Sequence, residues 1–207
     1  MFCVPIAARI GEYMDLSGKR IILASKSPRR KELLAAIAPE FDIMTAEVDE
    51  ALPEDMHPHR GVEMLAVRKG APIAIDAPDA IVISSDTLVE LGGVALGKPA
   101  DEDDACRMLR ELSGKAHNVH TGVAVHYLGK VYSGVDFTAV RFRDMSDEEI
   151  RAYVDGGEPM DKAGAYGIQG EGGKFVLGYD GEFDTVMGLS VKLTAALIER
   201  ALGGNRE

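Results

Sequence analysis

The sequence predicts a protein of the α/β class, built around one mixed β-sheet with helices packed against it. Short apolar runs at 20–24 and 80–86 are typical of buried strands, and the first leads through a short loop into a helix. Two longer segments, 117–127 and 130–143, alternate between apolar and polar residues on either side of a Leu-Gly turn, which indicates an antiparallel hairpin. Both kinds of strand belong to one sheet, so we expect that sheet to be mixed.

The remaining elements follow from helix-start residues, turn residues and periodicity. Ser27 and Pro28 are typical of a helix start, and the pair Gly92-Gly93 predicts the turn of a hairpin. Ser146 and Glu149 form the pattern of a capping box. The other expected elements are an exposed strand at 41–49, a strand at 174–179 and helices at 60–75, 101–113, 146–156 and 189–202.

Composition and charge limit the possible function classes. The 207 residues, 46% hydrophobic and 28% charged, suffice for one core or for two small lobes. We expect residues 1–18 to be an N-terminal extension and 19–207 to be one domain. Cys3 and Cys106 are too far apart in sequence to suggest a disulfide framework. The chain lacks a signal-peptide pattern and a membrane-length apolar run, so we expect a cytoplasmic protein without a membrane partner. A net charge of −11 argues against a nucleic-acid partner.

One segment reverses the overall charge and predicts an anion site. Residues 19–31 contain six Lys or Arg and no acid. Within it the loop 25–30 (SKSPRR) leads into the helix that starts at Pro28, and a helix N-terminus presents free backbone N–H groups and a partial positive charge. Serine hydroxyls and guanidinium groups at this point suit phosphate oxygens. The alternative is an ordinary capped helix with arginines that face solvent.

The pattern around Lys98 resembles a Walker A motif without completing it. Gly92 and Gly97 have the right spacing, but Pro99 stands where that motif needs Ser or Thr. Without the hydroxyl there is no magnesium ligand, and a proline disrupts the loop-to-helix geometry. We therefore reject an ATPase P-loop and expect Lys98 to act as a point charge on a phosphate.

Two acidic positions and a glycine-rich loop are further candidates. We expect Asp86 and Glu50 to lie at the ends of strands, where open α/β sheets bind ligands, although a single carboxylate there is more often a turn residue. In the loop 161–170 (DKAGAYGIQG), Gln169 carries a paired amide donor and acceptor that complement a uracil or thymine edge. A flexible loop without ligand is the alternative.

Together these motifs resemble the Maf family of nucleotide pyrophosphatases over about residues 20–200. The matching stretches, in the order typical of the family, are 23–34 (LASKSPRRKELL), 48–50 (VDE), 84–99 (SSDTLVELGGVALGKP), 108–125 (MLRELSGKAHNVHTGVAV) and 158–170 (EPMDKAGAYGIQG). The resemblance implies a Maf/HAM1-like (ITPase-like) fold, with a twisted mixed sheet flanked by helices and two lobes around a central cleft. It also implies a homodimer that depends on Mg or Mn. The sequences of 84–99 and 158–170 look like the subgroup that hydrolyses dTTP and UTP to the monophosphate and pyrophosphate.

The resemblance also implies roles for individual residues. Asp86, Lys98 and Arg30 are the expected catalytic residues, with Asp86 as proton acceptor, and Glu50 joins Asp86 as a metal ligand. The expected substrate-binding residues are Ser25, Ser27, Arg29, Lys69, Thr87 and Gln169.

The chain departs from the family pattern in its first 18 residues, which have no counterpart there, and at two positions within 181–191. In 181–191 (GEFDTVMGLSV), Thr185 and Ser190 replace an Asn and a Pro of that pattern, which is expected to loosen one wall of the cleft or alter base selection. The alternatives are a pyrophosphatase for 7-methyl-GTP or another non-canonical nucleotide, and a nucleotide-binding regulator of cell division without turnover.

Overall fold

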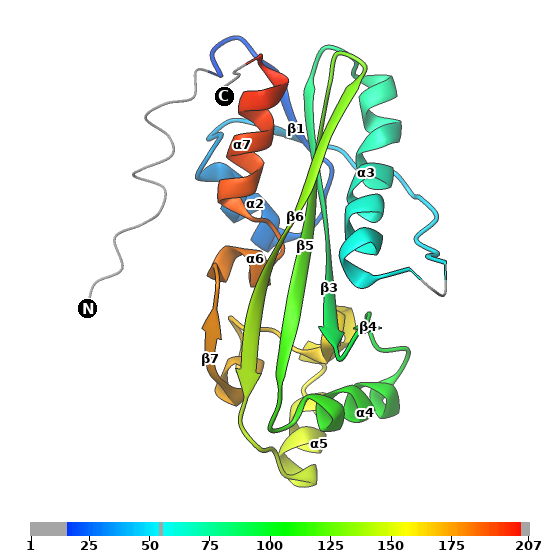
Figure 1. The fold of residues 1–207 in the computed structure, drawn as a ribbon, viewed down its shortest axis with the longest axis vertical. Coiled ribbons are helices and arrows are strands. Elements are labelled where there is room, and N and C mark those ends of the chain that lie inside the picture. The colour runs from blue at the N-terminus through cyan, green and yellow to red at the C-terminus, as the bar shows by residue number, and fades with distance from the viewer. Residues whose placement is uncertain (1–15, 54–55, 204–207) are drawn as a thin grey trace, which may run out of the picture.

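A mixed seven-stranded sheet organises the computed structural model, which describes residues 16–53 and 56–203 (Figure 1). The strand order is β2-β1-β3-β5-β6-β7, and β4 pairs with β3 outside this path. The strands are β1 (Ile21–Leu23), β2 (Asp42–Ile43), β3 (Ile81–Leu91), β4 (Val94–Leu96), β5 (Ala116–Tyr127), β6 (Lys130–Phe142) and β7 (Val176–Asp180). The helices are α2 (Pro28–Ala35), α3 (Pro58–Asp76), α4 (Glu102–Leu112), α5 (Asp147–Asp155), α6 (Phe183–Met187) and α7 (Val191–Ala201), with 3₁₀ helices at Glu158–Asp161, Ala163–Ala165 and Glu171–Phe175.

The sheet is mixed, which confirms the predicted fold class. Strand β1 is parallel to both β2 and β3, whereas β3, β4, β5, β6 and β7 pair with one another antiparallel. The long hairpin of β5 and β6 turns at Leu128 and Gly129, whose φ angles of 49° and 75° are left-handed. This is the turn geometry that matches the twist of two-residue hairpins.

The helices divide the buried apolar residues into an upper and a lower group. In the upper lobe, α2 and α7 lie on one side of the sheet and α3 on the other, and their apolar side chains pack on β1 and the first half of β3 (Figure 1). In the lower lobe, α4 and α5 pack with the far ends of β3, β5 and β6 (Figure 1). Strands β3, β5 and β6 run through both lobes, so they fix how the lobes face each other.

Three sequence predictions need correction. The strand expected at 41–49 is only two residues long, because its one partner, β1, itself ends at Leu23 opposite Ile43. The strand expected at 80–86 continues to Leu91, because β5 pairs with it from Val82 to Glu90 and β4 pairs with its end. Helix α6 was not predicted, since five residues are too few to show a helical period.

Several other predictions concern the chain ends and membranes. Most of the expected extension 1–18, together with Cys3, lies outside the described residues, while Cys106 is buried. Within the described part of the chain, no helix is long and apolar enough to cross a membrane.

Candidate active site

The site lies at a break in the pairing along one edge of β3. Strand β1 pairs with this edge at Ile81–Ile83, and β4 pairs with the same edge at Val89–Leu91. Because β1 is parallel to β3 and β4 is antiparallel, the carboxyl ends of β1 and β4 point toward each other across the intervening residues 84–88. A cavity of about 970 Å³ opens at this break.

All ten residues predicted to form the site line this cavity. They are Ser25, Ser27, Arg29, Arg30, Glu50, Lys69, Asp86, Thr87, Lys98 and Gln169. The prediction that Asp86 ends a strand is wrong, because it lies in the middle of β3, opposite Gly122 of β5. Glu50 does not end a strand either and lies in the coil that follows β2. Asp86 is nevertheless level with the ends of β1 and β4, so the rule that ligands bind at carboxyl ends of strands still locates the site.

The loop between β1 and α2 is shaped by its two serines. Ser27 is the N-cap of α2, and its hydroxyl accepts a hydrogen bond from the backbone N–H of Arg30 at 3.5 Å. The Ser25 hydroxyl accepts from the backbone N–H of Ser27 at 3.2 Å. The first turn of α2 contains no acidic residue, so the N-terminus of the helix presents uncompensated positive potential to the cavity.

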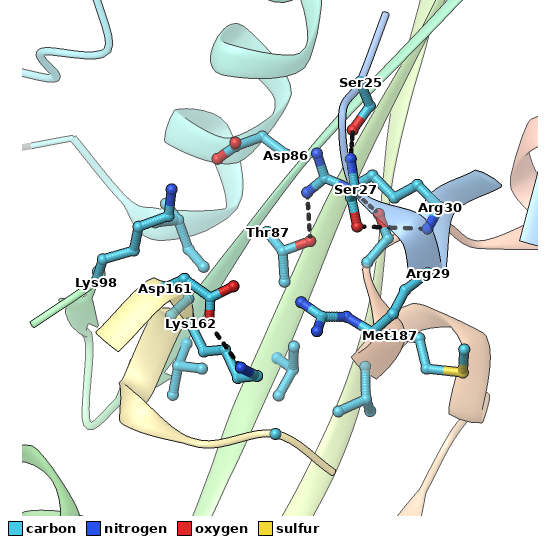
Figure 2. Close-up of a pocket in the computed structure, with 18 of the residues that line it drawn as sticks. Ser25, Ser27, Arg29, Arg30, Asp86, Thr87, Lys98, Asp161, Lys162 and Met187 are labelled. Carbon is cyan, nitrogen blue, oxygen red and sulfur yellow. Dashed lines mark hydrogen bonds and ion pairs between the residues drawn. The ribbon is translucent and has the colours of Figure 1, made fainter. Parts of the chain in front are cut away.

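Arg30 connects three segments that are distant in sequence. Its Nε donates to the carbonyl of Gly188 at 2.8 Å, and its Nη1 donates to the carbonyl of Ser85 at 2.7 Å. Its Nη2 donates to the hydroxyl of Thr87 at 3.3 Å (Figure 2). Burial lowers the pKa of the guanidinium, and the nearby Asp86 carboxylate opposes that shift. Three of the five N–H groups are therefore occupied by protein, which leaves two for a ligand.

Asp86 and Glu50 converge on one ammonium group. The Nζ of Lys69, on α3, lies 2.5 Å from an oxygen of Asp86 and 3.1 Å from an oxygen of Glu50. The Asp86 side chain is only 10% exposed, whereas that of Glu50 is 57% exposed. Two carboxylates that already share one cation can share another, and carboxylate oxygens are the donors that Mg²⁺ and Mn²⁺ prefer.

The lower lobe contributes basic groups from the opposite side of the cavity. Lys98 is the second residue after β4, and Figure 2 shows it across the cavity from Arg29 and Arg30. The backbone N–H of Gly164 donates to the carbonyl of Gly97 at 3.0 Å, which ties the end of β4 to the glycine-rich loop. The cavity is thus lined by basic side chains from both lobes.

Sequence analysis missed the pair Asp161 and Lys162, which also lines the cavity. The Nζ of Lys162 donates to the carboxylate of Asp161 at 2.6 Å and to the carbonyl of Glu158 at 2.7 Å. Both residues lie in the segment 161–170 that the sequence had already singled out. An adjacent pair of opposite charges is not a specific signal for a site in the sequence, because such pairs are common on ordinary surfaces.

The glycine-rich loop is held by the half-buried carboxylate of Glu158. Glu158 accepts hydrogen bonds from the Tyr153 hydroxyl at 2.8 Å and from the backbone N–H of Glu171 at 2.9 Å. A Cβ on Gly170 would lie 2.4 Å from the Glu158 carboxylate, so a larger residue here would displace that carboxylate. The loop is therefore fixed against the lower lobe, with exposed Gln169 at the cavity rim.

The two departures from the family pattern within 181–191 lie behind the cavity wall rather than on it. Thr185 and Ser190 are fully buried. The Ser190 hydroxyl donates to Asp136 at 2.8 Å and also caps α7, and the Thr185 hydroxyl lies 3.4 Å from the same carboxylate. These bonds join α6 and α7 to β6, and the expected effect of the two replacements on the wall or on base selection stays a prediction.

Comparison with known proteins gives consistent matches over most of the chain. A family model described as "Maf-like protein" matches residues 20–201. A dTTP/UTP pyrophosphatase of Bacillus velezensis is 44% identical over 176 residues, which cover 85% of this chain and 93% of the relative. A dTTP/UTP pyrophosphatase of Pelotomaculum thermopropionicum is 46% identical over 184 residues, which cover 88% and 96%. Among solved structures, the Staphylococcus aureus Ham1 protein has a TM-score of 0.43 and 17% identity, covering 61% of this chain and 73% of its own.

Proposed function

The chain belongs to the Maf-like protein family, and from this membership we propose that it hydrolyses dTTP and UTP to the nucleoside monophosphate and pyrophosphate. Such an enzyme has a house-cleaning role, which extends to modified pyrimidine nucleotides. One observation carries the proposal: basic side chains from both lobes surround the acidic pair Asp86 and Glu50 at the break in β3. That arrangement suits a triphosphate, because the basic groups can bind its phosphates while a carboxylate lies close to the phosphorus that reacts.

The basic groups bind and stabilise the triphosphate. Lys98 and the N-terminus of α2 attract the phosphate oxygens, and the two remaining N–H groups of Arg30 add fixed donors. Lys69 leaves its carboxylate partners to contact phosphate when the substrate arrives. Catalysis of phosphoryl transfer depends mainly on positioning and on stabilising the negative charge that develops.

Asp86 is the proposed proton acceptor. A water oxygen forms a bond to the α-phosphorus, the bond from that phosphorus to the α–β bridging oxygen breaks, and pyrophosphate leaves. The proton of the water passes to the Asp86 carboxylate, which general base catalysis requires to lie within hydrogen-bond reach. The Asp86 side chain is only 10% exposed and lies on the central strand β3, and both features restrict where its carboxylate can lie.

A divalent cation, Mg or Mn, fits the acidic pair. Asp86 and Glu50 would hold it, and Mg²⁺ in nucleotide sites is commonly bound by one or two carboxylates together with substrate phosphates. Phosphate oxygens of the substrate would be the further ligands. When bound, the cation neutralises charge on the phosphates.

The base and the assembly complete the proposal. Gln169, Thr87 and Arg29 select the base, and the paired donor and acceptor of Gln169 support a uracil or thymine edge. We further propose a cytoplasmic homodimer, with residues 19–207 as one domain beside the extension 1–18. The net charge of −11 supports the absence of a nucleic-acid partner, and we propose no membrane partner.

Substitution of the proposed base tests the function. Asp86→Asn should reduce pyrophosphate release from dTTP and UTP by about 10²–10⁴-fold, because it removes general base catalysis. Asp42→Asn is the control, since Asp42 is exposed on β2 and pairs with exposed Arg20. Circular dichroism checks that both variants fold.

A substrate panel separates the alternatives. We expect dTTP and UTP to be hydrolysed faster than CTP, 7-methyl-GTP and ITP. Fastest turnover of 7-methyl-GTP would contradict the proposed base selection. Tight triphosphate binding without turnover across this panel, with Mg or Mn added, would instead favour a nucleotide-binding regulator.

A further inference from the structure

The hydroxyl of Thr87 belongs to a chain of hydrogen bonds that fixes where its proton lies. Thr121, on β5, faces Thr87 across the β3–β5 pair, and their hydroxyl oxygens are 3.0 Å apart. The Thr121 hydroxyl is also 2.7 Å from the backbone carbonyl of Thr185. Thr121 is fully buried, so water cannot replace these partners.

The donor and acceptor roles of these hydrogen-bonded groups permit one arrangement of their protons. A carbonyl oxygen only accepts, so the single proton of Thr121 points to Thr185. The proton between the two threonine oxygens must then come from Thr87. Any other arrangement would place two oxygen lone pairs in contact inside the protein, with the cost of an unsatisfied buried polar group.

Arg30 restricts Thr87 from the other side. A guanidinium only donates, and its Nη2 occupies one lone pair of the Thr87 oxygen at 3.3 Å (Figure 2). With its proton committed to Thr121 and one lone pair committed to Arg30, Thr87 retains one lone pair. Any further hydrogen bond from Thr87 must therefore come from a donor on the ligand.

We infer that Thr121 is a positioning residue that locks the cavity-lining Thr87 as an acceptor, and that this lock discriminates uracil and thymine from cytosine. The inference rests on the proposed function. We place the Thr87 hydroxyl opposite position 3 of the base, where uracil and thymine have the donor N3–H. Cytosine has its donor at the neighbouring 4-amino group and an acceptor at N3, which would meet the Thr87 lone pair. Gln169 cannot make this distinction alone, because turning its amide by 180° exchanges donor and acceptor and suits cytosine equally well.

The test removes the lock and leaves Thr87 in place. In Thr121→Val the proton of Thr87 is free to point at N3 of cytosine. The ratio of kcat/KM for UTP to that for CTP should then fall about tenfold, the effect of one misplaced hydrogen bond. The carbonyl of Thr185 still accepts from the backbone N–H of Gly188 at 3.2 Å, so the variant retains a satisfied backbone at this point.

Two further variants separate positioning from general damage to the fold. Thr121→Ser restores the hydroxyl and should restore the ratio. Thr138→Val is the matched control, since Thr138 is a fully buried threonine on neighbouring β6 that donates to the carbonyl of Glu182 at 2.8 Å. It should leave the ratio unchanged.

The outcomes distinguish this inference from the proposed function. If Thr121→Val does not fold, Thr121→Cys takes its place, because a thiol is a weak hydrogen-bonding group of similar size. An active valine or cysteine variant with an unchanged UTP-to-CTP ratio overturns the inference alone. A wild-type protein that hydrolyses neither UTP nor dTTP overturns the proposed function, and the inference with it.

Discussion

Replacing Arg30 by lysine tests whether this side chain links the two walls of the cavity. The guanidinium donates to Ser85, Thr87 and Gly188, and a lysine ammonium cannot reach three acceptors spread over β3 and the loop after α6. Hydrogen bonds to charged groups contribute about 1.5–3 kcal/mol each, so loss of two predicts a destabilisation of about 3 kcal/mol at the lower bound. We use the lower bound because the carbonyl of Gly188 would keep one hydrogen bond, the one it accepts from the Ser85 hydroxyl at 2.7 Å, when the bond from Arg30 is lost.

Thermal unfolding measures this effect against a control on the same helix. For a chain of this size each kcal/mol lowers Tm by about 2–4 °C, so Arg30→Lys should lower Tm by about 6–12 °C. Arg29→Lys is the matched control, because Arg29 precedes Arg30 on α2 and takes no part in the three bonds. A decrease of less than about 2 °C in Arg30→Lys, the effect of an ordinary surface substitution, would refute the reasoning.

Two further predictions concern the packing of α3 and the stability in acid. A Cβ on Gly122 would lie 2.4 Å from the carbonyl oxygen of Val62 on α3, so Gly122→Ala should cost about 1–3 kcal/mol and lower activity by displacing that helix. Gly178→Ala on β7 has open space and should change neither Tm nor activity, and equal effects of the two would contradict the packing argument. The hydrogen bond from Asn118, helped by those from His120 and Gly93, lowers the pKa of Glu90 from 4.5 to about 2. Because this pKa is depressed in the folded state, Glu90 stabilises the protein above about pH 4.5 and loses that effect between pH 4.5 and 2. Glu90→Gln should therefore be less stable than wild type at pH 7, with a difference that closes over this range in urea unfolding; a constant difference would argue against it.

The residues of the site could be predicted from sequence because each has a local cause. Ser27 and Pro28 start a helix, and the run 19–31 is basic without any knowledge of its neighbours. Gly92 and Gly93 turn a hairpin and thereby locate Lys98 at the end of a strand. The long hairpin of β5 and β6 follows from alternation in the same way.

The geometry of the site could not be predicted, because it depends on which strands pair. The sequence does not show that the strand expected at 80–86 and the hairpin arm before Gly92 form one continuous strand. It also does not show that β1 and β4 share one edge of that strand and leave residues 84–88 between them. The three bonds of Arg30 join residues up to 158 positions apart, and local patterns contain no information about such contacts. The proton lock on Thr87 likewise depends on the neighbouring strand and on the backbone of Thr185.

The position of bond cleavage is the central claim, and oxygen-18 labelling tests it most directly. The protein is incubated with UTP or dTTP and a divalent cation in H₂¹⁸O, and the products are analysed by mass spectrometry. Attack of water on the α-phosphorus predicts one labelled oxygen in the nucleoside monophosphate and unlabelled pyrophosphate. Label in pyrophosphate or in orthophosphate would show attack at the β- or γ-phosphorus and would contradict the account.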